Sequence, residues 1–234
     1  MNMITCAVAQ QISATDDDLS RCRTGTYSGF HITLWPCDDK IGAIWPSDIA
    51  RHLSKIVCFP ESVHSPFSAA QYAVELADSM KNAAAHVKLY ALLRNAHEAY
   101  LGHVSPAVRA AEKLMAKQNH GKDARDALEA AFSTRIFKAL NLLTLEAATE
   151  RKLITAKDLA AIDTARQRLD ATLERDLGVY IHRQDKARRV MPLPRFIVPL
   201  RWDKASDKYL RSYQRLVLAS RERISADNEV LEIF

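Results

Sequence analysis

The sequence predicts an all-α protein, and three observations lead to this fold class. Only 6 Gly and 8 Pro interrupt 234 residues, and Ala, Leu, Lys, Arg and Glu, which favour helices, are frequent in the second half. Apolar residues recur with helical spacing in several segments after residue 46. Because 48% of the residues are hydrophobic, the chain can bury a core as one large domain. We therefore expect a helical bundle.

The segment from Thr26 to Pro46 differs from the rest of the chain. Aromatic and β-branched residues alternate there with Gly and Pro, a pattern that predicts a short β-hairpin or an extended flap. Residues 1–25 are expected to form an N-terminal arm, in which the acidic run at residues 16–18 is a candidate helix start.

Helices are expected wherever the apolar period coincides with start and stop signals. Ser68 is a candidate N-cap, Pro106 suits the first position of a helix, and Thr155 with Asp158 resembles a capping box whose helix ends at Gly178. Three prolines exclude a helix from Met191 to Leu200. The expected helices are Ser47 to Ile56, Ser68 to Ala85, Val87 to Tyr100, Pro106 to Gln118, Lys122 to Leu145, Thr155 to Leu177 and Asp203 to Arg223.

Cysteine use and hydropathy indicate a soluble, cytoplasmic protein. The four cysteines, Cys6, Cys22, Cys37 and Cys58, are widely spaced and form no C-x-x-C pair, which favours a reduced compartment. The apolar run near the N-terminus is too short for a signal peptide, and no stretch approaches the roughly 20 apolar residues of a membrane span. We expect no membrane association.

The positive charge is concentrated near the C-terminus. Between Arg183 and Arg223 there are twelve Lys or Arg against four Asp or Glu, an excess of eight, although the whole chain carries only +5. Such a segment contacts nucleic acid or an acidic partner, or it is a solvated helix face with ordinary packing of its arginines. The candidate nucleic-acid contacts are Lys186, Arg188, Arg189, Arg195 and Arg201, next to Phe196 and Trp202.

A resemblance to a known family rests first on the stretch from Ala91 to Gly102. It reads Ala-Leu-Leu-Arg-Asn-Ala-His-Glu-Ala-Tyr-Leu-Gly. This is similar to the motif-bearing helix of HD-domain phosphohydrolases, in particular the phage- and prophage-type branch similar to 5'-deoxynucleotidases, which reads Leu-His-Asp-Ala and then Glu-Ala-Tyr. The chain keeps this frame and carries Arg94 and Asn95 in place of the His-Asp pair.

Further stretches resemble the same family in the same order. Phe67 to Gln71 resembles the segment before the family's first metal-binding His, whose place Tyr72 takes. Ala165 to Gly178 is similar to the helix with the last metal-binding Asp, whose place Arg166 takes. The remaining matches are Ser28-Gly29, Asp48-Ile49-Ala50 and Leu53-Ser54 for the flap and first helix, and Ile197 to Leu200, Ala205, Tyr209, Leu210 and Tyr213 for a Pro-Leu turn and closing helix.

The resemblance implies an HD-domain helical bundle over residues 26–217, with an arm at 1–25 and a tail at 218–234. It also implies an origin in a phage, prophage or mobile element, and a homodimer as a candidate assembly. HD enzymes hold a divalent metal with His and Asp, and a guanidinium has no lone pair to offer. We therefore expect no metal at the HD position and no cofactor.

Two interpretations of the arginines stay open. In the first, they replace the positive charge of the metal and grip a phosphate or another anion without cleaving it. In the second, they result from drift and pair with neighbouring acids such as Glu98 or Asp170. Glu98 stands where the family keeps an acid that assists proton transfer, so it is vestigial or an ion-pair partner of Arg94. The candidate ligand contacts are Tyr72, Arg94, Asn95, His97 and Arg166.

Three functions follow as hypotheses. The leading one is a catalytically inactive HD-domain protein that binds a nucleotide-like anion or a protein partner as a regulator. The second is a metal-dependent deoxynucleotide phosphohydrolase with a metal site rebuilt from Glu98 and the nearby histidines. The third is a nucleic-acid-binding protein that uses the basic C-terminal segment. The histidines considered for the rebuilt site are His64, His86, His97 and His103.

Overall fold

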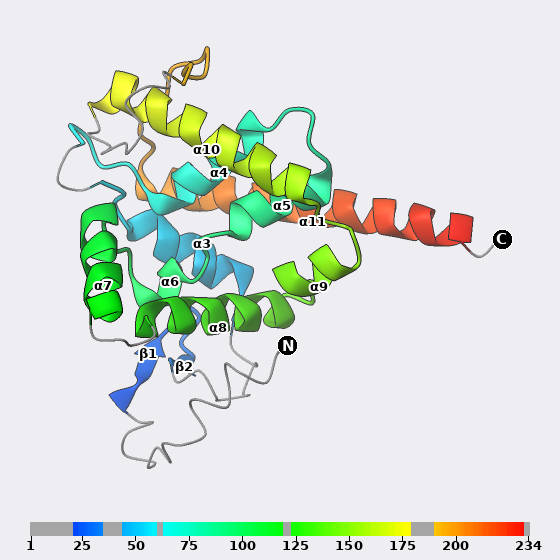
Figure 1. The fold of residues 1–234 in the computed structure, drawn as a ribbon, viewed down its shortest axis with the longest axis horizontal. Helices are drawn as coiled ribbons and strands as arrows, with labels where there is room; N and C mark the ends of the chain where they lie inside the picture. The colour runs from blue at the N-terminus through cyan, green and yellow to red at the C-terminus, as the bar shows by residue number, and fades with distance from the viewer. Residues whose placement is uncertain (1–20, 35–43, 60–62, 119–122, 179–189, 232–234) are drawn as a thin grey trace.

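The computed structural model describes residues 21–34, 44–59, 63–118, 123–178 and 190–231, with side chains described as far as Arg221. These residues form a bundle of helices with one two-stranded antiparallel sheet, as Figure 1 shows. The prediction of an all-α fold with a short N-terminal hairpin is confirmed. Most of the expected arm, residues 1–20, lies outside the described residues.

The hairpin consists of β1 (Arg23–Gly25) and β2 (His31–Thr33), with Thr24 opposite Ile32. It begins three residues before the segment in which it was expected. Gly29 has a φ of 86° in the turn, a conformation that side chains with a Cβ rarely adopt. The later part of the expected flap, residues 35–43, lies outside the described residues.

The first helices of the bundle confirm some expected boundaries and correct others. Ser68 caps its helix through Gln71 N–H, as predicted, but that helix ends at Ser79 instead of Ala85 because Met80 leaves the helical conformation. The single helix expected from Val87 to Tyr100 is in fact two, separated by a turn. The helices are α3 (Pro46–Lys55), α4 (Ala69–Ser79), α5 (Ala85–Leu93) and α6 (Glu98–Leu101).

The second half of the chain follows most of the sequence signals, but the helix expected from Lys122 to Leu145 ends at Ala139, and a separate helix begins at Leu145. Thr155 and Asp158 form the predicted capping box, and Gly178 ends that helix with a φ of 68°. Residues 191–200 are not helical, as the prolines predicted. The helices are α7 (Pro106–Gln118), α8 (Ala124–Ala139), α9 (Leu145–Glu150), α10 (Ala156–Leu177) and α11 (Trp202–Leu231).

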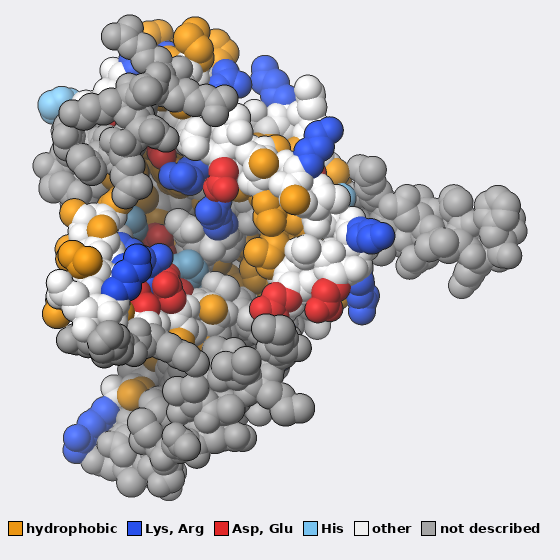
Figure 2. Space-filling view, viewed as in Figure 1, with side chains coloured by type: hydrophobic (Ala, Val, Ile, Leu, Met, Phe, Trp, Pro, Cys, Tyr) orange, Lys and Arg blue, Asp and Glu red, His pale blue; other side chains and the backbone are white. Residues whose placement is uncertain are grey.

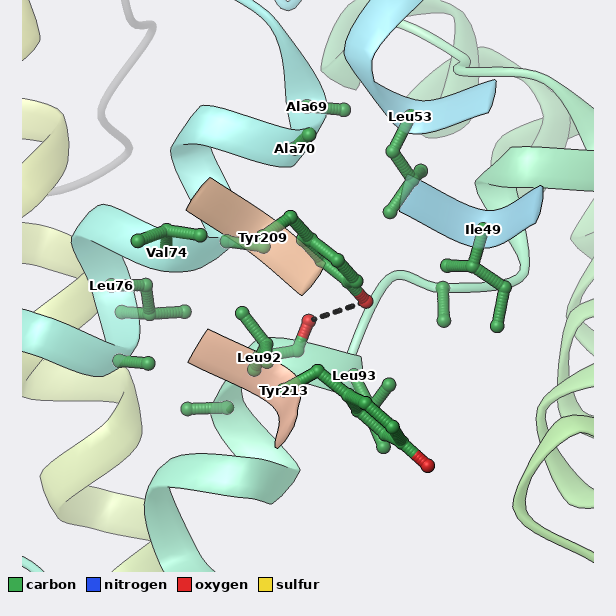
Figure 3. Packing of buried hydrophobic residues seen from close by; sticks show 14 of the residues in the cluster. Ile49, Leu53, Ala69, Ala70, Val74, Leu76, Leu92, Leu93, Tyr209 and Tyr213 are labelled. Atoms are coloured by element: carbon green, nitrogen blue, oxygen red, sulfur yellow. Dashed lines mark hydrogen bonds between the residues drawn. The ribbon is translucent and has the colours of Figure 1, made fainter. Parts of the chain in front are cut away.

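The hydrophobic core lies where α11 packs against α3, α4 and α5. Tyr209 of α11 is fully buried there, and its hydroxyl donates a hydrogen bond of 3.5 Å to the carbonyl of Leu92, as Figure 3 shows. Leu92 and Ile49 are also fully buried. Beyond this core α11 continues as a helix that extends away from the bundle (Figure 1).

Polar side chains tie the connecting segments to this core. Asp48 of α3 accepts hydrogen bonds from the backbone N–H and the hydroxyl of Ser28, at 3.0 and 2.6 Å, which fixes the hairpin turn on the bundle. The amide of Gln71 donates to the carbonyl of Val198 and accepts from the N–H of Leu200. Several residues of the family-like pattern therefore have a structural role in this fold.

Two structural observations concern the expectations drawn from hydropathy and from the cysteines. None of the helices in the described ranges is both long enough and apolar enough to cross a bilayer. Cys22 and Cys58 carry free thiols, and Cys6 and Cys37 lie outside the described residues.

Candidate functional site

The site begins at the break between α5 and α6. Arg94 is the C-terminal cap of α5, and the chain turns through Asn95 and Ala96 before α6 begins at Glu98. Arg94 therefore lies at a helix end and not within one continuous helix from Val87 to Tyr100, which was the expectation. Its side chain is 45% exposed, so water solvates part of the guanidinium.

A chain of alternating hydrogen-bond donors and carboxylate acceptors runs from this break to α4, and we call it the Arg–Asp ladder: Arg94, Asp163, Arg166, Asp170 and Tyr72. Arg94 Nη1 donates to Asp163 Oδ1 at 2.9 Å, and Arg166 Nε lies 3.8 Å from the same oxygen. Arg166 Nη1 donates to Asp170 Oδ2 at 3.2 Å. The Tyr72 hydroxyl donates to Asp170 Oδ1 at 2.8 Å. The structure thus links Tyr72, Arg94 and Arg166, which sequence reasoning selected separately.

Helix geometry explains why three of these residues meet. Asp163, Arg166 and Asp170 stand at positions i, i+3 and i+7 of α10, so they share one face of the helix. The ladder has a buried end and an exposed end: the Asp170 side chain is 10% exposed, whereas that of Asp163 is 51% exposed.

The buried end holds Tyr72 as a neutral hydrogen-bond donor. Burial raises the pKa of Tyr72 well above its usual value, and the negative charge of Asp170 and the hydrogen bond to it raise the pKa further. A metal ligand would need the phenolate form, so this environment opposes coordination by Tyr72.

The predicted pairing of the arginines with neighbouring acids is correct for one and wrong for the other. Arg166 pairs with Asp170, as expected. Arg94 does not pair with Glu98 but with Asp163 on α10, because the helix break removes the i, i+4 geometry. Glu98 instead accepts a hydrogen bond of 3.1 Å from Asn95 Nδ2.

His97 contacts α8 and not the ladder. Its Nδ1 lies 3.1 Å from Ser133 Oγ, and its Nε2 lies 3.9 Å from a carboxylate oxygen of Glu129, both on α8. Burial lowers the pKa of His97, and the negative charge of Glu129 offsets only part of this effect. Of the candidate ligand contacts, His97 is thus directed to α8, and the structure gives it no contact with the ladder.

Of the residues considered for a rebuilt metal site, the structure brings His103 and Glu98 together and directs His86 and His97 to other partners. His86 Nε2 lies 2.8 Å from the Leu153 carbonyl, and His103 Nδ1 lies 3.1 Å from Glu98 Oε2. His64 is exposed, and its ring lies against Gly178, where an added Cβ would come within 2.3 Å of Nε2. Within the described ranges, no three His, Cys, Asp or Glu side chains group closely enough to hold a metal ion.

The described nucleic-acid candidates already bind acids of the same chain. Arg195 forms an ion pair with the buried Glu75, which also binds Lys208 at 2.8 Å. Arg201 Nε donates to Asp203 at 2.7 Å. The remaining three candidates, Lys186, Arg188 and Arg189, lie outside the described residues.

Sequence reasoning missed Asp163, which joins the two arginines. Its signal was available, because an acid three residues before Arg166 lies on the same helix face. What the sequence could not show is that Arg94, 69 residues earlier, reaches this carboxylate across the bundle.

The surface around the ladder carries both signs of charge. Figure 2 shows Lys or Arg together with Asp or Glu side chains beneath α10, and a second mixed group around α7 and α8, on either side of a recessed part of this face. On α7, Arg109 binds Glu112 and Asp123, each at 2.9 Å.

Comparison with known proteins adds no relative. The chain matches no protein-family model, and a search of curated proteins finds no significant match.

Proposed function

We propose that this protein is a catalytically inactive HD-domain-like protein that binds a nucleotide-like anion as a regulatory or sequestering factor. The observation that carries the proposal is the Arg–Asp ladder, in which two guanidinium groups lie where the family resemblance expects metal ligands. The ladder joins residues of α4, α10 and the α5–α6 break, which are the segments that carry the resemblance.

The chemistry of the ladder opposes metal-dependent hydrolysis. A guanidinium stays protonated and has no lone pair, so neither Arg94 nor Arg166 can coordinate a cation. Both carboxylates of the ladder already accept charge-assisted hydrogen bonds from these arginines. A divalent ion would have to break these bonds and lie beside two positive charges.

An anion, in contrast, can bind at the exposed end of the ladder. Arg94 and Arg166 both approach Asp163, and all three side chains are at least 42% exposed. Exposed ion pairs stabilise a fold by only about 0–1 kcal/mol, so displacement of Asp163 costs little. A phosphate group has the geometry to bind two guanidinium groups at once.

Thermal shift and calorimetric titration with mono- and dinucleotides test the proposal. Arg94→Ala should weaken nucleotide binding about tenfold or more, because a charge-assisted hydrogen bond contributes roughly 1.5–3 kcal/mol. Asp163→Asn should strengthen it about fivefold, since removal of a competing carboxylate worth roughly 1 kcal/mol frees both guanidinium groups. Arg151→Ala, on an exposed arginine outside the ladder, is the matched control.

Two results would contradict the proposal in different ways. Nucleotide binding that is unchanged in Arg94→Ala rules out the ladder as the site, and the absence of nucleotide binding in the unaltered protein favours a protein partner instead. Phosphate release from deoxynucleotides with Mn²⁺, Co²⁺ or Mg²⁺ that is abolished by EDTA contradicts catalytic inactivity and favours the phosphohydrolase hypothesis. Light scattering during purification tests the expected homodimer.

A further inference from the structure

A second candidate site is a cavity at the other end of the α4–α5 pair. It has a volume of about 530 Å³ and lies where the last turn of α4, the first turn of α5 and α11 meet. This volume falls within the range of roughly 300–1,000 Å³ that is usual for small-molecule sites. Its lining consists of Ala77, Asp78, Lys81, Ala83, Ala85, Lys88, Arg215, Leu216 and Ala219.

The charged side chains of the lining leave an excess of two positive charges. Arg215 Nη2 donates to Asp78 Oδ1 at 3.1 Å, so these two charges balance. Lys81 and Lys88 supply the excess, and Lys88 Nζ is held by a hydrogen bond of 3.1 Å to the Lys81 carbonyl. The cavity therefore attracts a dianion.

The start of α5 adds to this positive potential. Ala84 is the N-cap of α5 and has no side chain that accepts a hydrogen bond, whereas Ser68 and Thr155 cap α4 and α10 through their hydroxyls. The partial positive charge of a helix N-terminus favours an anion there. Here it supplements the charge of the two lysines.

The apolar part of the lining determines which organic group attached to the anion can fit. Alanine side chains and Leu216 make up the rest of the surface, and no aromatic ring is among the lining residues. Such a surface accepts a short aliphatic group but offers nothing on which a nucleobase could stack. A phosphate monoester carries about −1.5 to −2 charge at neutral pH, which matches the excess.

We propose that this cavity binds a small, non-aromatic phosphate monoester. The site is separate from the Arg–Asp ladder, because Tyr72 and Arg94 lie at one end of the α4–α5 pair and Asp78 and Lys88 at the other. Tyr72 and Asp78 are about 9 Å apart along the helix axis, at roughly 1.5 Å per residue. The two proposals can therefore fail independently.

Titration of the full-length protein with glycerol 3-phosphate, followed by calorimetry and by thermal shift, tests this site. We expect saturable binding to the unaltered protein and a loss of affinity of at least tenfold in the double variant Lys81→Gln/Lys88→Gln, which removes the two excess charges. Lys157→Gln, on an exposed lysine of α10, should bind as the unaltered protein does. Arg94→Ala should also bind normally, which separates this site from the ladder.

A second variant and two anion controls make the result decisive. Ala219→Glu places a carboxylate in the cavity and should abolish binding, while circular dichroism reports whether each variant is folded. Inorganic phosphate should bind more weakly than glycerol 3-phosphate because it does not use the apolar lining. The proposal is wrong if sulfate at equal ionic strength stabilises the protein equally, if folded Ala219→Glu binds normally, or if no saturable binding occurs.

Discussion

The two sides of the bundle are held together by different forces. On one side, α3, α4, α5 and α11 bury a continuous apolar core around Tyr209. On the other, α7 has no buried residue and contacts α8 through the ion pairs of Arg109 with Asp123 and Asp126. α10 contributes buried side chains such as Leu169 to this core, and the ladder adds polar contacts along one of its faces. Stability is therefore expected to come mainly from the apolar core, and α7 is expected to contribute little.

The largest expected effect comes from truncation of the same residue type on the two sides. Leu92→Ala removes a fully buried side chain and should lower the free energy of unfolding by about 2–5 kcal/mol. Leu114→Ala on α7, where the leucine is 58% exposed, should change it by less than about 0.5 kcal/mol. Urea denaturation measures both, and similar values would contradict the comparison.

A smaller effect is expected at the buried end of the ladder. Tyr72→Phe keeps the ring but removes the 2.8 Å hydrogen bond to Asp170, and should cost about 1–2 kcal/mol because a buried carboxylate oxygen loses its donor. Tyr27→Phe, at a tyrosine that is 58% exposed, is the matched control and should be neutral. A neutral Tyr72→Phe would contradict a stabilising role of this hydrogen bond.

Loss of the ion pairs of α7 should speed up hydrogen exchange in α7 alone. In Arg109→Met the ion pairs with Glu112, Asp123 and Asp126 are lost, so the backbone amides of α7 should exchange with deuterium several-fold faster. Salt at about 1 M should act in the same direction in the unaltered protein, because it shortens the Debye length to about 3 Å. Equal acceleration in α4 would mean that the two sides unfold together.

The smallest effect concerns pH. The pKa of His97 is lowered in the folded protein, so below the ordinary pKa of about 6.5 the unfolded chain binds a proton that the folded one does not. Stability should therefore fall as the pH drops from 7 through this value. The decrease should be smaller in His97→Gln, as measured by denaturation at several pH values. Identical pH profiles would contradict the assignment.

Much of the fold could be predicted from local signals. The capping residues Ser68 and Thr155 and the C-cap Gly178 fixed helix ends correctly, because caps depend on neighbouring residues alone. The break after Leu93 was missed because the apolar period continues through Ala96, which is buried in the turn as it would be in a helix. The apolar period indicates which side chains are buried, and a continuous helix and a helix followed by a turn bury the same side chains here.

The candidate site was predictable only in part. The family-like motifs selected Tyr72, Arg94 and Arg166, which the ladder joins, and the i, i+4 rule correctly paired Arg166 with Asp170. The same rule failed for Arg94, whose partner is distant in sequence. Contacts between distant segments follow from the packing of whole helices, which local patterns do not encode.

The central proposal is that two guanidinium groups lie where the resemblance to HD-domain enzymes predicts a metal. Titration of the purified protein with Mn²⁺, followed by electron paramagnetic resonance, tests it most directly. We expect the free Mn²⁺ signal to rise in proportion to the metal added, with no saturable site. One tightly bound Mn²⁺ per chain that is lost on substitution of Asp163 or Asp170 by Asn would contradict the claim.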